Sequence, residues 1–164
     1  MNAKNASRNA AMQKDDSFAA EIHRAFPACP PGLSDEECEE LAGNLPLLRT
    51  EDLLRWLPAL MLRMSETPPE SWPWDADIVA IFLDGANLRR EKDGSFVARS
   101  ENSPFFDPRA KDVFSGFTSE QNAAVLRFLR DVLLPAWPEC VPVVSAIVFW
   151  EYRTTHPATK EQRQ

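Results

Sequence analysis

Apolar side chains recur at helical spacing in three stretches of the chain. Phe18, Ile22 and Phe26 stand four residues apart, which predicts a first helix over residues 16–25. A wider stripe of the same period crosses residues 50–66 and comprises Leu53, Leu54, Leu57, Leu60, Met61 and Met64. A third stripe comprises Ala124, Val125, Phe128, Leu129, Val132 and Leu133. It is wide enough to face a core, so we expect Val125, Phe128, Leu129 and Val132 to be buried.

Two capping boxes predict where helices begin. Ser34 with Glu37, and Thr118 with Gln121, have the spacing at which two side chains satisfy free backbone N–H groups at a helix start. The first box should open a short acidic helix that ends near Gly43. The second should open the helix that carries the third apolar stripe.

Other signals set the remaining helix boundaries. Thr50 is expected to cap the helix over 50–66. Pro58 should kink that helix, because proline removes one backbone hydrogen bond. Pro135 and Pro138 should end the helix that follows Thr118.

Three stretches are less clear. The apolar run within residues 78–88 is continuous, and short continuous runs fit either a helix or a strand. Residues 142–153 are rich in branched side chains, which favour a strand, although their apolar positions also fit a helix. Residues 89–108 have no helical period, but the turn signal "KDGS" allows a small hairpin there.

These elements predict one all-α domain over residues 16–156, with five or six short helices and an irregular segment at 89–108 that could contain a hairpin. The chain has 164 residues, which is enough for one domain with a core. The polar residues 1–15 are expected to form a disordered leader, and residues 157–164 a frayed tail.

Three fragments of the chain resemble an uncharacterised family of small bacterial proteins of unknown function. They are "LLRWLPALML" at 53–62, "GFTSEQNAAVLRFLRDV" at 116–132 and "AIVFWEYR" at 146–153. The resemblance implies helices at 78–88 and 142–153, and it carries no catalytic residues. Such proteins look like small accessory proteins, a kind that often accompanies bacterial toxin–immunity systems. This association implies a binding role rather than a mechanism.

The chain offers little catalytic or metal-binding chemistry. Its histidines are His23 and His156, and the spacing of His23 from Cys29 and Cys38 is unlike that of structural zinc sites. With Cys140 the cysteine count is odd, which favours free thiols in a reducing compartment over a disulfide framework. A nucleophile elbow is also missing from the sequence. We therefore expect no enzyme activity, metal or cofactor.

The charge balance excludes several other classes of protein. A net charge of −7 is unfavourable for binding nucleic acid, which requires cationic side chains. The polar N-terminal residues do not resemble a signal peptide. The sequence also contains no apolar stretch near the ~20 residues of a membrane span. A cytoplasmic location without membrane contact is the expectation.

The acidic residues are concentrated in one part of the chain. Residues 15–77 contain 14 acidic and four basic side chains, a net charge of −10, whereas residues 78–164 contain 11 of each. The densest point, "DEECEE", supplies Asp35, Glu36, Glu37, Glu39 and Glu40. Two interpretations are open: a face that only keeps the protein in solution, or a surface that steers a basic partner.

The second interpretation leads to a hypothesis about function. Trp72 and Trp74 stand beside Asp75 and Asp77 in "ESWPWDAD", where they could anchor a partner or pack at a loop. With "DEECEE" they form the candidate partner-binding set. The hypothesis is a non-catalytic immunity or inhibitor protein that neutralises a basic bacterial toxin. The alternative is an acidic adaptor or chaperone-like partner of a secretion apparatus, which would use an exposed apolar groove. An enzyme of unknown class ranks third.

Overall fold

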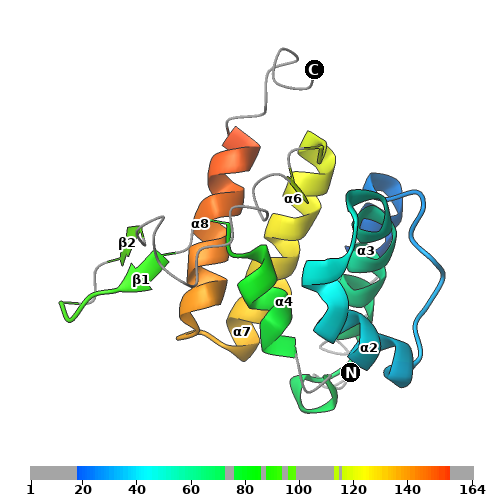
Figure 1. The fold of residues 1–164 in the computed structure, drawn as a ribbon, viewed down its shortest axis with the longest axis horizontal. Helices are drawn as coiled ribbons and strands as arrows, with labels where there is room; N and C mark the ends of the chain where they lie inside the picture. Colours follow the sequence, from blue (N-terminus) through cyan, green and yellow to red (C-terminus); the bar gives the residue numbers. More distant parts are fainter. Residues whose placement is uncertain are drawn as a thin grey trace, which may run out of the picture.

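Helices make up most of the described chain. The computed structural model describes residues 18–72, 76–85, 88–93, 96–98, 113–114 and 116–155. The elements, in chain order, are a helix over 18–25, α2 (Asp35–Asn44), the 3₁₀ turn η1 (Leu45–Leu47), α3 (Thr50–Glu66), the 3₁₀ turn η2 (Pro69–Ser71), α4 (Ala76–Leu83), β1 (Leu88–Arg90), β2 (Phe96–Ala98), α6 (Ser119–Phe128), the π-helical turn η3 (Leu129–Leu133), α7 (Leu134–Ala136) and α8 (Val141–Thr155). The all-α fold class is confirmed (Figure 1).

Parts of the predicted domain organisation lie outside the described residues. They are the leader at 1–15, the tail at 157–164 and the stretch 99–108 of the irregular segment. The remainder of that segment contains the small hairpin that "KDGS" allowed. Its strands β1 and β2 pair antiparallel, with Arg89 opposite Val97.

Both predicted capping boxes are confirmed. The Ser34 N–H donates to Glu37 Oε2 (2.8 Å), and the Glu37 N–H donates to Ser34 Oγ (3.2 Å). At the start of α6, the Thr118 N–H donates to Gln121 Oε1 (2.9 Å), and the Gln121 N–H donates to Thr118 Oγ1 (3.2 Å). Gln121 also donates from Nε2 to the Ala25 carbonyl (3.0 Å), which ties the start of α6 to the end of the helix at 18–25.

The start of α3 corrects one prediction. Thr50 is the first helical residue, and the N-cap is Arg49, whose backbone is extended (φ −76°, ψ 159°) and whose side chain makes no capping bond. The Arg49 carbonyl accepts the Leu53 N–H (2.8 Å) and so makes the first hydrogen bond of the helix. The helix therefore starts one residue earlier than it would if Thr50 were the cap. Pro58 is buried inside α3, and the helix continues through it to Glu66.

The two ambiguous apolar stretches form the helices α4 and α8, but the helix implied over 78–88 is too long, because α4 ends at Leu83 and Leu88 belongs to β1. Each buries one face, which on α4 comprises Ala76, Val79, Ala80 and Leu83. Apolar residues also lie exposed away from these faces, such as Ile81 of α4 and Val148 of α8, and they hide the helical period in the sequence. α8 packs against α4 and lies antiparallel beside α6, while α2 packs against α3 and α4 (Figure 1). The Trp150 indole of α8 is fully buried and donates to the Leu83 carbonyl at the end of α4 (3.0 Å).

The third stripe meets the core, with one exception. Val125, Phe128 and Leu129 are fully buried, as predicted, but Val132 is only half-buried. The cause is η3, where the Leu134 N–H donates to the Leu129 carbonyl, five residues back. A π-helical turn contains one residue more than an α-helical turn, so the side chains that follow are rotated away from the original face.

Proline also acts differently from the prediction at the end of this helix. Pro135 does not stop it, because α7 continues the helical path through Pro135 to Ala136. A proline has no N–H to offer the preceding turn, and the π-helical turn η3 lies directly before α7. The helical path ends before Pro138, as predicted.

Candidate protein-binding surface

The acidic helix α2 presents all five predicted carboxylates to solvent. Cys38 and Ala42 face the core, and this four-residue spacing leaves the remaining side chains of α2 outside. The exposed carboxylates are Asp35, Glu36, Glu37, Glu39 and Glu40. All five are thus exposed on one helix, and their role in binding a partner stays a prediction.

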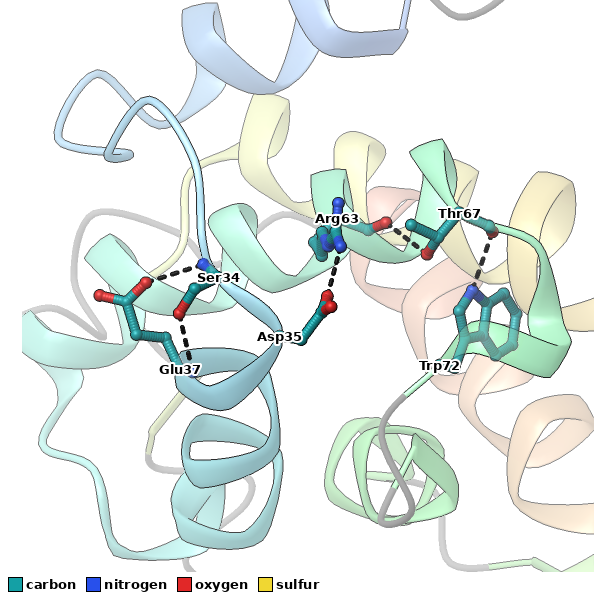
Figure 2. Close-up of polar contacts among 6 residues, drawn as sticks. All are labelled: Ser34, Asp35, Glu37, Arg63, Thr67 and Trp72. Carbon is teal, nitrogen blue, oxygen red and sulfur yellow. Dashed lines mark hydrogen bonds and ion pairs between the residues drawn. The ribbon is translucent and has the colours of Figure 1, made fainter.

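Two of these carboxylates have partners within the protein. Asp35 forms an ion pair with Arg63 of α3, and the two side chains point toward each other in Figure 2. Glu37 belongs to the capping box, and its hydrogen bonds from Ser34 lower the pKa of its carboxyl group. Glu36, Glu39 and Glu40 make no ion pair within the described residues. They are the charges that α2 offers to solvent.

Arg63 lies beside this surface and forms an ion pair with Asp35. The hydrogen bond to Asp35 raises the pKa of the Arg63 guanidinium. The Asp35 side chain is 84% exposed, so the pair adds at most about 1 kcal/mol to stability. Its main effect is to neutralise the positive charge of Arg63 beside the acidic helix.

Trp72 lies beside the Asp35–Arg63 pair and is half-buried. Its Nε1 donates to the carbonyls of Met64 (2.9 Å) and Thr67 (3.1 Å), as Figure 2 shows for Thr67. These bonds satisfy free carbonyls where α3 ends. Of the other predicted residues, Asp77 is exposed in the first turn of α4, while Trp74 and Asp75 lie outside the described residues.

Trp137, which the sequence reasoning missed, packs edge-on against Trp72. The two ring centres are 5.2 Å apart and the ring planes are 87° apart. Trp137 lies in the turn between α7 and α8, where its N–H donates to the Leu133 carbonyl (2.9 Å) and its carbonyl accepts the Cys140 N–H (3.1 Å). The sequence did contain a pattern that could have pointed to Trp137. "WPE" at 137–139 repeats the combination of tryptophan, proline and acidic residue seen in "WPWD" at 72–75.

Three hollows surround this tryptophan pair. One of about 30 Å³ lies between α2 and α3, and its walls include Asp35, Glu39 and Trp72. A second, of about 200 Å³, lies on the other side of Trp72 and is closed by the ion-paired Arg127. The third, of about 650 Å³, opens beside Trp137. The surface thus joins an aromatic centre to acidic edges, an arrangement found at protein-binding sites.

The described residues contain no cluster of three or more metal-ligating side chains. His23 is exposed, Cys38 is buried and Cys29 is half-buried, while His156 lies outside the described residues. All three cysteines are free thiols. Burial raises the pKa of the Cys29 thiol to about 11, which is opposite to the activation that a nucleophile needs.

Within the described part of the chain, no helix is both long enough and apolar enough to cross a membrane. The chain matches no protein-family model, and comparisons with curated proteins and with solved structures gave no match. The resemblance to small accessory proteins therefore stays a prediction.

Proposed function

We propose that this protein is a non-catalytic binding protein, and specifically an immunity or inhibitor protein that neutralises a basic bacterial toxin. The observation that carries the proposal is the exposed group Glu36, Glu39 and Glu40 on α2, which forms no ion pair with another described residue. It lies on the helix whose Asp35 adjoins the half-buried Trp72. An inhibitor needs such a surface and needs no chemistry of its own.

Electrostatics supports this proposal physically. Like charges on one helix repel each other mildly, so they contribute little to the stability of the isolated protein. Facing a basic partner, the same charges raise the rate of association and disfavour acidic competitors. Aromatic side chains next to the charges would then slow dissociation, because desolvated aromatic groups supply much of the binding energy at interfaces.

The alternative role as a secretion adaptor calls for an apolar groove that holds a helix. The large apolar side chains that are exposed in the described residues are Leu47, Ile81, Val148 and Tyr152. Leu47 lies in η1, Ile81 in α4, and the other two in α8. The hollow beside Trp137 is instead edged by the carboxylates of Asp77 and Glu139, which favours a basic partner. The other two hollows each include an ion-paired arginine, Arg63 or Arg127, beside their carboxylates.

The test begins with a pull-down from the source cells, followed by an activity and growth assay of the captured protein. We expect a basic partner whose toxicity is suppressed when the two proteins are coexpressed. Replacing Glu36, Glu39 and Glu40 by Lys should slow association by about tenfold or more at low salt. It should also weaken the salt dependence of the association rate, because salt screens these charges over about 8 Å at physiological ionic strength.

The matched control replaces Glu51, Asp52 and Glu120 by Lys. These three carboxylates are also exposed, and they lie at the starts of α3 and α6. Both triple variants change the net charge equally, so a local effect of α2 appears as a difference between them. Equal association rates for the two variants would reduce α2 to a face that only keeps the protein in solution. A partner that retains its activity in the complex would remove the inhibitor role.

A further inference from the structure

The hollow beside Trp137 is lined by charges of one sign among the described residues. The described lining residues are Asp77, Ala136, Trp137, Pro138, Glu139 and Cys140, none of which is basic. Asp77 comes from the first turn of α4, whereas the other five come from the α7–α8 turn. Two segments that are 60 residues apart in the chain therefore bring two carboxylates to one indole.

The position of the indole is fixed from two sides. The edge-on contact with Trp72 and the hydrogen bonds at both ends of the 137–140 turn hold the Trp137 ring at the wall of the hollow. Asp77 and Glu139 are exposed and make no ion pair within the described residues, so both charges remain available. The full charge of Asp77 outweighs the partial positive charge at the start of α4.

We propose that this hollow binds an arginine side chain of the partner. An indole face attracts a guanidinium group through its quadrupole, and carboxylates accept its N–H groups in pairs. The hollow is wide and open to solvent, so a side chain of a partner can enter it without a rearrangement of the protein. This inference rests on the proposed function, because it names the group by which a basic partner is anchored.

The test uses a peptide probe and does not need the partner. Acetyl-Arg-Arg-Arg-amide is titrated into the ¹⁵N-labelled protein at low ionic strength, while the five indole N–H signals are followed by NMR. The Trp137 signal is assigned by its loss in Trp137→Phe. We expect this signal to move with the arginine peptide. The same peptide with citrulline, which has the same shape but no charge, should leave it in place.

Variants that replace carboxylates by neutral amides of the same shape locate the binding site. Asp77→Asn with Glu139→Gln should weaken binding of the arginine peptide about three- to tenfold, because two exposed charge contacts are lost. Glu51→Gln with Glu120→Gln removes the same amount of charge from the starts of α3 and α6 and should change the affinity less than about twofold. Since all four side chains are exposed, these variants keep the fold and the result can be read directly.

The outcomes separate this inference from the proposed function. The inference is wrong if the Trp137 signal does not move, if citrulline binds equally, or if the Asp77/Glu139 variant binds like the wild type. If the peptide binds as expected and the association rate of the captured partner is unchanged by the triple Lys variant of α2, the arginine site is supported. In that case the role of α2 in the proposed function is wrong. If the partner depends on α2 but the peptide does not bind, only the hollow is refuted.

Discussion

Thr118 holds the start of α6 through a single side-chain oxygen. Thr118→Ala removes the acceptor for the Gln121 N–H, so we expect a loss of about 0.5–2 kcal/mol in the free energy of unfolding. Urea denaturation measures the loss. Ser119→Ala, one residue later and without a role in the capping box, is the control. Equal stability of the two variants would show that the capping bond contributes nothing measurable.

Phe128 tests whether the third apolar stripe serves the core or a partner. The side chain is fully buried, and Phe128→Ala should lower the free energy of unfolding by about 3–5 kcal/mol. Val132→Ala, at a half-buried position of the same stripe, should cost clearly less. A Phe128→Ala protein with wild-type stability and impaired partner binding would reassign the stripe to an interface.

Cys29 should be a slow thiol. With its pKa raised from 9.0 to about 11, its thiolate fraction at pH 8 is roughly a hundredfold below that of an unshifted thiol. Iodoacetamide labelling followed by mass spectrometry should therefore modify Cys29 more slowly in the folded protein than in urea. The folded state keeps this proton longer than the unfolded state, so the group lowers stability as pH rises from 9.0 to about 11. Fast labelling of folded Cys29 at pH 8 would contradict the assigned cause.

At the scale of elements, Trp72 closes the end of α3. Trp72→Phe keeps an aromatic ring beside Trp137 but leaves the Met64 and Thr67 carbonyls without the indole donor. We expect a loss of about 1–2 kcal/mol, the usual net value of one or two hydrogen bonds. Faster amide exchange in the last turn of α3 should accompany it.

The control for this element is Trp56→Phe. Trp56 is also half-buried on α3, and its indole makes no hydrogen bond within the described residues. If both variants lose equal stability, the cost reflects ring size and not the bonds that close α3.

Sequence reasoning located the helices well where a cap and a period agree. The starts of α2 and α6 follow from capping boxes, whose side chains act within four residues. The apolar period was a poor guide to α4 and α8 and to the burial of Val132. α4 and α8 carry exposed apolar residues such as Ile81 and Val148 outside their buried faces, and the extra residue in η3 turned Val132 from the core. The start of α3 was misplaced because Thr50 resembles a cap, while the backbone is already helical at that residue.

On the scale of the whole molecule, the acidic surface should contribute little to stability. Replacing Glu36, Glu39 and Glu40 by Lys should change the free energy of unfolding by less than about 1 kcal/mol, because exposed charges interact weakly. Urea denaturation tests this prediction without knowledge of the partner. Asp35→Lys is the contrasting variant, since it replaces the Arg63 ion pair by a repulsion. A loss above about 2 kcal/mol in the triple variant would make these charges structural.

The candidate surface could be predicted only in part. "DEECEE" is continuous in sequence, so a local pattern sufficed to place its charges on one helix. The partner of Trp72 is Trp137, 65 residues away in the chain, and the sequence does not state which distant tryptophans meet. The sequence likewise does not state that Asp77 and Glu139 line one hollow, because they are far apart in the chain. Both depend on how α4 packs beside the α7–α8 turn.

The position of α8 has a consequence for synthesis on the ribosome. This helix covers α4 and α6 and supplies the buried Trp150, which contacts the aromatic rings of Phe114 and Phe117. Because α8 follows all of these elements in the chain, the apolar faces that it covers on α4 and α6 stay exposed until α8 leaves the ribosome. Nascent chains stopped before α8 should bind chaperones and be cut rapidly by protease, whereas chains that expose α8 should resist. The proposed inhibitory role would then require that translation has passed α8.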